Sequence, residues 1–276
     1  RKRFQLVLGP RRVGKTTAMY QTVAKLVDSG VDPFNILWLT LNVPYLMERP
    51  LNAWVRGVLR SAEVSQGSPL YIFLDEVNYA DKWDLWLKTF YDEQLPVRIV
   101  ATSSSTAALR DRQFESGVGR WEEQFLPPCL LSEYLELRGI SVPQHAGAHL
   151  RESLGLASAN KRAIANLEQH RRRFLLVGGF PELILAPDAP DEASDILRSQ
   201  QTLRSDAIQR AVGMDIPQAF SVNEPIKLEK LLYVLAGQIG GLIRPTTLAT
   251  DVGLSAPTIH QYLDYLEKAY LILLLP

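Results

Sequence analysis

The sequence Gly9-Pro10-Arg11-Arg12-Val13-Gly14-Lys15-Thr16 decides the fold of this chain, because it matches G-x-x-x-x-G-K-[ST] at every constrained position. An apolar, strand-like run from Phe4 to Leu8 leads into it, and a helix-like run from Thr16 to Asp28 follows. In this context the two glycines allow backbone N–H groups to turn toward phosphate oxygens. The stretch therefore predicts a loop that holds the phosphates of a nucleotide.

Each end of this loop has a predicted role. Lys15 would place a positive charge beside the β- and γ-phosphates, and the N-terminus of the following helix would face the same anion. Thr16 would supply a hydroxyl ligand to Mg²⁺. The alternative is a glycine-containing turn that binds nothing, which the complete pattern disfavours. The residues predicted to contact the nucleotide are Gly9, Pro10, Arg11, Arg12, Val13, Gly14, Lys15, Thr16 and Thr17.

The first half of the chain alternates short apolar runs with amphipathic helices. The runs are apolar on both faces, as in parallel strands that are covered by helices on each side. This order predicts an α/β, three-layer P-loop NTPase fold with a mostly parallel five-stranded sheet and ligands at the carboxyl ends of the strands. Between two of the strands, the aromatic stripe from Asp81 to Glu93 is interpreted as core packing. After Phe4 to Leu8, the further predicted strands are 35–41, 70–74, 98–101 and 121–126.

The third predicted strand ends in two carboxylates, Asp75 and Glu76. Asp75 would hold Mg²⁺, directly or through water, and Glu76 would orient or deprotonate the water that attacks the γ-phosphate. Alone, such a pair is as well explained by a strand that ends in solvated acidic residues. Downstream of a complete phosphate loop, with a strand between them, it becomes a strong indication of an ATPase site.

Two further features follow the fourth strand. The hydroxyl run Thr102-Ser103-Ser104-Ser105 would emerge beside the two motifs and contact the γ-phosphate or the water. It is also explained as a serine-rich cap of a helix from Thr106 to Arg112, and both interpretations can hold together. Arg120 is a candidate arginine finger and thus a third catalytic residue beside Lys15 and Glu76, although a lone arginine is more often a solvated surface charge.

These motifs occur together with Asp81-Lys82-Trp83, Leu126-Pro127-Pro128, Ser132-Glu133-Tyr134 and Gly178-Gly179-Phe180-Pro181-Glu182. The combination resembles the AAA-type ATPases of bacteria and archaea, which join the ATPase domain to a winged-helix segment and often to a nuclease-like C-terminal region. The resemblance implies ATP and Mg²⁺ as ligands and strengthens the assignment of Arg120. At two positions the chain departs from the pattern: Ser103 stands where the family usually has glycine, and Asn78 where it commonly has glutamine.

The rest of the chain is expected to be helical. Helices are predicted at 161–177 and 192–210, and we expect three parts: an ATPase core at 1–135, a helical region at 136–215, and a truncated helix-turn-helix or winged-helix-like domain at 216–276. In the last part a short helix at 246–251 and a turn at 253–255 precede the second helix of the motif. The predicted buried faces are Leu228, Leu231, Leu232, Leu235 and Ile239, and then Ile259, Tyr262, Leu263, Leu266 and Tyr270.

The outward face of that second helix carries His260, Gln261, Asp264, Glu267 and Lys268. Because phosphate attraction supplies much of the affinity for DNA, the acidic residues disfavour standard base reading. Contact with a protein or with another domain is favoured, and binding to nucleic acid stays open.

Composition limits the remaining possibilities. The 276 residues are 46% hydrophobic, and thirty basic residues balance thirty acidic ones, so the net charge directs the protein to neither nucleic acid nor membrane. Cys129 is the only cysteine, which excludes an internal disulfide, and its expected role is that of a small buried hydrophobe. No apolar run approaches the roughly 20 residues that span a bilayer. We expect a cytoplasmic protein, of which this chain is a fragment.

Two functions are compatible with these observations. In one, the protein hydrolyses ATP and couples its nucleotide state to movement of the C-terminal domain, in a possible homo-oligomer. In the other, it is a slow nucleotide-dependent switch or DNA-binding regulator in which hydrolysis is incidental. Glu76 favours the first, because a module that only binds nucleotide does not need it.

Overall fold

The computed structural model describes residues 3–61, 69–103, 119–140, 167–186, 192–220 and 222–275. The chain divides into two compact units. The first contains Arg1–Arg11, Lys15–Leu126 and Ile208–Pro276, and the second contains Arg12–Gly14 and Pro127–Ala207. The three-part division expected from the sequence stays a prediction.

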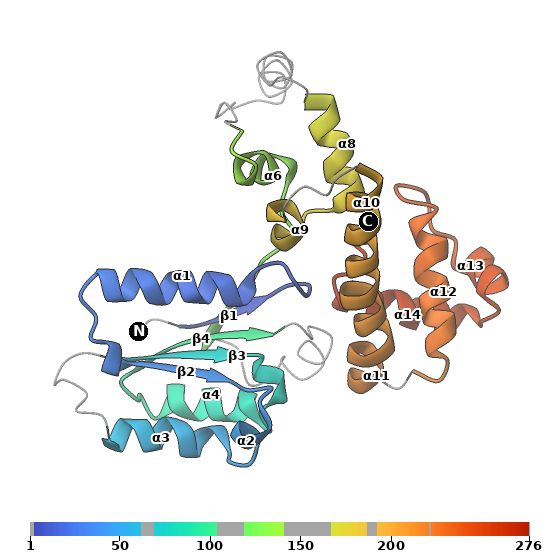
Figure 1. Cartoon of the computed structure of the whole chain (residues 1–276). Helices are drawn as coiled ribbons and strands as arrows, with labels where there is room; N and C mark the ends of the chain where they lie inside the picture. Colours follow the sequence, from blue (N-terminus) through green and yellow to red (C-terminus); the bar gives the residue numbers. More distant parts are fainter. Residues whose placement is uncertain are drawn as a thin grey trace, which may run out of the picture. The chain divides into compact units, whose positions relative to one another are not determined.

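The first unit contains a parallel sheet, which lies between helices on its two faces (Figure 1). Its order is β2-β3-β4-β1-β5, and every neighbouring pair is parallel. From β1 the chain crosses to β2 at the far edge of the sheet and returns through β3 and β4, and β5 then lies on the other side of β1. The strand order therefore changes direction beside β1. The strands are β1 (Phe4–Leu8), β2 (Ile36–Thr40), β3 (Leu70–Asp75), β4 (Val97–Ser103) and β5 (Trp121–Phe125).

Helices cover both faces of this sheet. Helix α1 (Lys15–Asp28) lies on one face, and α3 (Leu51–Ser61) and α4 (Trp83–Asp92) lie on the other (Figure 1). These helices explain why the strand sequence is apolar on both faces: Ile72 and Phe73 of β3 point to opposite faces of the sheet, and both are buried. The predicted three-layer α/β fold is confirmed. Shorter elements of this unit are η1 (Pro33–Asn35), α2 (Pro44–Met47) and the 3₁₀ turn η2 (Val77–Tyr79).

The aromatic stripe of α4 packs in the core. Trp83, Leu87 and Phe90 are buried there, and Trp86 and Tyr91 pack against the same cluster. The interpretation of the stripe as core packing, rather than a ligand site, is confirmed.

The register of the strands brings the predicted motifs to one edge. Leu8, the last residue of β1, pairs with Ser103 at the end of β4. Leu74 pairs with Ala101, so Asp75 lies level with the end of β4. Everything that follows β1, β3 and β4 therefore emerges at the same carboxyl edge.

The C-terminal helices have a hydrophobic cluster of their own in the first unit. Leu228, Leu231 and Ile259 are completely buried in it. Ser255 begins α14, and its side chain accepts a hydrogen bond from the Thr258 N–H, as the predicted turn requires. The elements are the π-helical segments η3 (Leu203–Gln209), of which Ile208 and Gln209 belong to this unit, and η4 (Ala211–Asp215), with α11 (Ile216–Ala219), α12 (Pro225–Ala236), α13 (Pro245–Val252) and α14 (Ala256–Lys268).

One residue of the predicted buried faces was assigned wrongly. Ile239 is 89% exposed, because α12 ends at Ala236 and the helical spacing no longer applies after Gly237. Tyr270 is half-buried and stacks on Phe125 of β5 with ring centroids 4.1 Å apart. Among the described residues after position 208 there are helices and turns but no strand, so the winged-helix assignment stays a prediction.

The second unit is helical. Its small core contains Tyr134, Leu135, Val177 and Ile184, with Cys129 packed against them and partly buried. The predicted helix at 106–112 and most of the region at 136–166 lie outside the described residues. The helices are α6 (Leu131–Leu137), α8 (Leu167–Val177), α9 (Pro181–Leu185) and α10 (Glu192–Thr202).

The search for a membrane-spanning helix, made over the described ranges, found none with the necessary length and hydrophobicity.

Candidate nucleotide-binding site

The loop after β1 turns sharply back into α1. Gly14 has φ +96°, a conformation that favours glycine, and Arg12 also lies in the left-handed region at φ 65°. The helix begins at Lys15, so its first N–H groups lie at this loop, as phosphate binding requires.

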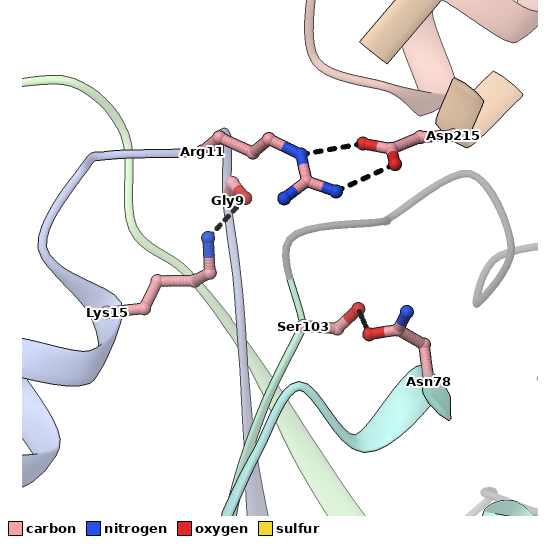
Figure 2. Close-up of polar contacts among 6 residues, drawn as sticks. All are labelled: Gly9, Arg11, Lys15, Asn78, Ser103 and Asp215. Carbon is pink, nitrogen blue, oxygen red and sulfur yellow. Dashed lines mark hydrogen bonds and ion pairs between the residues drawn. The ribbon is translucent and has the colours of Figure 1, made fainter. Parts of the chain in front are cut away.

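Lys15 is buried beneath the loop. Its Nζ donates hydrogen bonds to the carbonyl oxygens of Gly9 at 2.9 Å and Pro10 at 2.8 Å, the first of which is drawn in Figure 2. Burial lowers the pKa of Lys15 to about 8, although the carboxylates of Glu76, Asp75 and Asp215 oppose this effect. The lysine predicted to face the phosphates thus lies inside the turn of the loop.

The predicted metal ligands meet each other. Thr16 Oγ1 lies 3.1 Å from both carboxylate oxygens of Asp75, although the two residues are 59 positions apart. Asp75 is buried and also accepts a hydrogen bond from Thr102 Oγ1 at 2.5 Å. A carboxylate and a hydroxyl are oxygen ligands of the kind that Mg²⁺ prefers, so this pair fits the predicted ion.

Glu76 begins the turn after β3. Its backbone is left-handed at φ 55°, which is unfavourable for a residue with a Cβ. The Glu76 N–H donates to Thr102 Oγ1 at 3.2 Å, and this bond helps to hold the strained backbone. Thr102 therefore contacts both acidic residues, a role that the sequence did not predict for it.

Ser103, at the end of β4, is also fully buried. Its Oγ donates to Oδ1 of Asn78 in η2 at 2.8 Å (Figure 2). The hydroxyl run does emerge beside the acidic motif, but the hydroxyls of Thr102 and Ser103 contact protein groups there. Contact with a γ-phosphate stays a prediction, and Ser104 and Ser105 lie outside the described residues.

Arg11 forms a contact that sequence reasoning missed. Its Nε and Nη2 donate to the two carboxylate oxygens of Asp215 at 2.9 and 2.7 Å (Figure 2). The neighbouring Arg12 forms an ion pair with Glu182 of α9, within the second unit. No local pattern could have indicated the partner of Arg11, because Asp215 is 204 positions away.

Arg120 lies at the other end of the sheet. Its carbonyl oxygen accepts a hydrogen bond from the N–H of Phe4, the first residue of β1, whereas the phosphate loop follows the last. Its guanidinium group pairs with Asp92, with N–O distances of 2.9 and 3.2 Å. The chain therefore does not bring Arg120 to its own Lys15, Asp75 and Glu76, and a role in a neighbouring subunit's site stays a prediction.

Comparison with known proteins supports the class of the first domain. Residues 1–135 match a family model described as an AAA domain, and residues 168–276 match a domain of unknown function (DUF8612). Among curated proteins, the uncharacterized proteins MJ1637 and MJ1544 of Methanocaldococcus jannaschii are 24% and 22% identical to the chain. Each alignment covers 99% of this chain but 56% of the relative, so the chain spans about half their length.

Solved structures with some similarity include two that are covered only in part. PCH-2 of C. elegans has a TM-score of 0.35 at 16% identity, with 95% of this chain and 61% of that chain covered. The Hsp104–casein complex of S. cerevisiae has a TM-score of 0.37 at 15% identity, with coverages of 86% and 43%. Similarity at this level adds no argument of its own. The family match and the loop after β1 identify residues 1–135 as an AAA domain with a P-loop, as the resemblance predicted.

Proposed function

We propose that this chain binds Mg-ATP at the loop after β1 and hydrolyses it, and that the nucleotide state is coupled to the C-terminal helices. The observation that carries the proposal is the contact of Thr16 with Asp75. It joins the phosphate loop to the acidic end of β3, which is the arrangement that phosphoryl transfer needs.

The residues divide the chemistry among them. Lys15 and the N–H groups of the loop bind the phosphates, and Thr16 and Asp75 would hold the metal. Mg²⁺ at this position would neutralise charge on the β- and γ-phosphates. Glu76 accepts a proton from the attacking water while the water oxygen forms a bond to the γ-phosphorus. The bond from the γ-phosphorus to the β,γ-bridging oxygen breaks, which gives ADP and phosphate.

Single-turnover hydrolysis tests this proposal. We expect Glu76→Gln to bind Mg-ATP but to release phosphate at least about 100-fold more slowly than wild type, since general-base catalysis contributes a factor of this order. Glu123→Gln, an exposed position on β5, is the matched control and should behave as wild type. Equal, slow phosphate release by wild type and Glu76→Gln would instead support a nucleotide-dependent switch.

Binding is tested separately. Lys15→Ala removes the charge predicted to face the phosphates, and we expect a fluorescent ATP analogue to lose measurable affinity for it. Unchanged affinity would mean that the loop is not a phosphate site.

We also propose that the active form is a homo-oligomer in which Arg120 reaches the site of a neighbouring subunit. Its position at the amino edge of the sheet, away from the phosphate loop of its own chain, supports action in trans.

A further inference from the structure

We propose that Asp215 is a positioning residue for the nucleotide: it fixes the guanidinium group of Arg11 beside the phosphate loop, where Arg11 distinguishes a nucleoside triphosphate from a diphosphate. This inference rests on the proposed function. It adds a residue from the C-terminal helices to the candidate site and a means of reading its nucleotide state.

The geometry of the pair is specific. Two N–H groups of Arg11 meet the two oxygens of Asp215, a bidentate arrangement that fixes orientation as well as distance. The side chains are only 17% and 9% exposed. Asp215 ends the π-helical segment η4, and Val212 and Ile216 on either side of it are buried in the C-terminal cluster. The carboxylate is therefore held on a packed element.

The surroundings of Arg11 point to the γ-phosphate side of the site. Burial disfavours its charged form, but hydrogen bonding to Asp215 and the charges of Asp215 and Glu76 outweigh this effect and raise its pKa above the usual value. Glu76 is the residue proposed to activate the water that attacks the γ-phosphate. Arg11 follows β1 and Glu76 follows β3, so both residues leave the sheet at the carboxyl edge, where the γ-phosphate of a bound nucleotide would lie.

Arg11 can serve both partners. Asp215 uses Nε and Nη2, and Arg11 also has a side-chain hydrogen bond with Tyr79. A guanidinium group has five N–H donors, so donors are left for a phosphate oxygen. In Figure 2 the nitrogen that does not contact Asp215 is turned away from the carboxylate. Without Asp215, the long side chain would have to be ordered by the nucleotide itself, and part of the binding free energy would be lost.

The test measures affinities for fluorescent ATP and ADP analogues in the presence of Mg²⁺. For Arg11→Ala, we expect the preference for ATP over ADP to fall at least about tenfold, as for loss of a hydrogen bond to a charged group. Asp215→Asn should lower the same preference in the same direction, and Asp215→Glu, which keeps the carboxylate, should restore part of it. In Arg11→Ala/Asp215→Asn the preference should be no lower than in Arg11→Ala alone, because the residues act as one unit.

The matched control is Arg56→Ala, which breaks an ion pair with Glu93 that does not involve the phosphate loop. It should leave the ATP-to-ADP preference unchanged. Thermal unfolding of each variant shows whether it is folded, and Asp215→Asn keeps the shape of the side chain.

An unchanged or increased preference for ATP in folded Asp215→Asn would overturn the inference, since Asp215 would then be structural or would compete with phosphate. Hydrolysis and binding by wild type would still stand, so only this inference would fail. Absence of nucleotide binding by wild type would overturn both.

Discussion

Ser103 donates a hydrogen bond to Asn78, and these are the two positions at which the chain departs from the AAA-type pattern that it resembles. The departures therefore meet in one contact. A hydroxyl where glycine is usual reaches an amide that is shorter than the usual glutamine, so the two changes complement each other.

Changing only one member of this pair should be harmful. Ser103→Gly leaves the Asn78 carbonyl without its donor, and we expect a stability loss of about 1 kcal/mol together with slower hydrolysis. The double variant Ser103→Gly/Asn78→Gln carries the usual family pair and should recover most of both. Thermal unfolding and steady-state phosphate release measure these effects, and purely additive losses in the double variant would show that the positions are independent.

Nucleotide binding should depend on pH through Lys15. Its pKa of about 8 means that the ammonium form is lost as pH rises through 8, so affinity for a nucleotide without Mg²⁺ should fall up to about tenfold per pH unit above that point. The charged groups of Glu76, Arg11, Asp75 and Asp215 face this ammonium group. A titration from pH 6 to 9.5 would reveal the break, and Lys15→Arg should remove it.

The lowered pKa of Lys15 should make folding stability increase with pH, whereas nucleotide affinity decreases. Between about pH 8 and the ordinary value of 10.5, the unfolded chain binds a proton at Lys15 that the folded chain has lost. The contribution of this group to stability therefore rises with pH across that window. Chemical denaturation of wild type and Lys15→Met at pH 7.5 and 9.5 would measure it, and an equal pH response of the two proteins would contradict the assignment.

Action of Arg120 in trans can be tested by mixing variants. Arg120→Ala and Glu76→Gln should each be inactive alone, with losses on the order of 10³ for the arginine. A mixture should recover activity, because a mixed interface joins an intact Glu76 to an intact Arg120. Wild-type specific activity should also rise with protein concentration. An inactive mixture together with a flat dilution series would exclude the donation of Arg120 to a neighbour.

The second unit contains a close backbone approach at Gly179. A Cβ on this residue would lie 2.3 Å from the carbonyl oxygen of Cys129, whose N–H donates to the Gly179 carbonyl at 2.6 Å. We expect Gly179→Ala to destabilise the protein by about 1–3 kcal/mol, as overpacking does. Gly57→Ala in helix α3 is the control. Apart from its chain neighbours and the nearby backbone of its own helix, none of the described atoms lies within 4 Å of the position that a Cβ would take there, and the change should stabilise by about 0.5–1 kcal/mol. Equal unfolding temperatures for the two variants would contradict this.

The sheet could be predicted from sequence because its signals are local. A strand such as β3 is a short apolar run buried on both faces, and the loop after β1 has a fixed spacing. The contacts of Arg11 and Arg12 could not be predicted, since they depend on tertiary packing across 204 and 170 positions. The helix expected at 192–210 changes to π-helical geometry at Leu203, and a search at a period of 3.6 residues does not detect such a change.

The hydrogen bonds from Lys15 to Gly9 and Pro10 close a ring within the phosphate loop. The lysine thus holds the two arms of the loop together, in addition to its proposed role as a ligand for phosphate. When a nucleotide binds, the ammonium group would exchange its hydrogen bonds to these carbonyl oxygens for bonds to phosphate oxygens, which limits the net gain in affinity. Replacing Lys15 removes these two hydrogen bonds together with the positive charge. If a Lys15 variant does not bind nucleotide, the loss can therefore come from a changed loop conformation as well as from the missing charge.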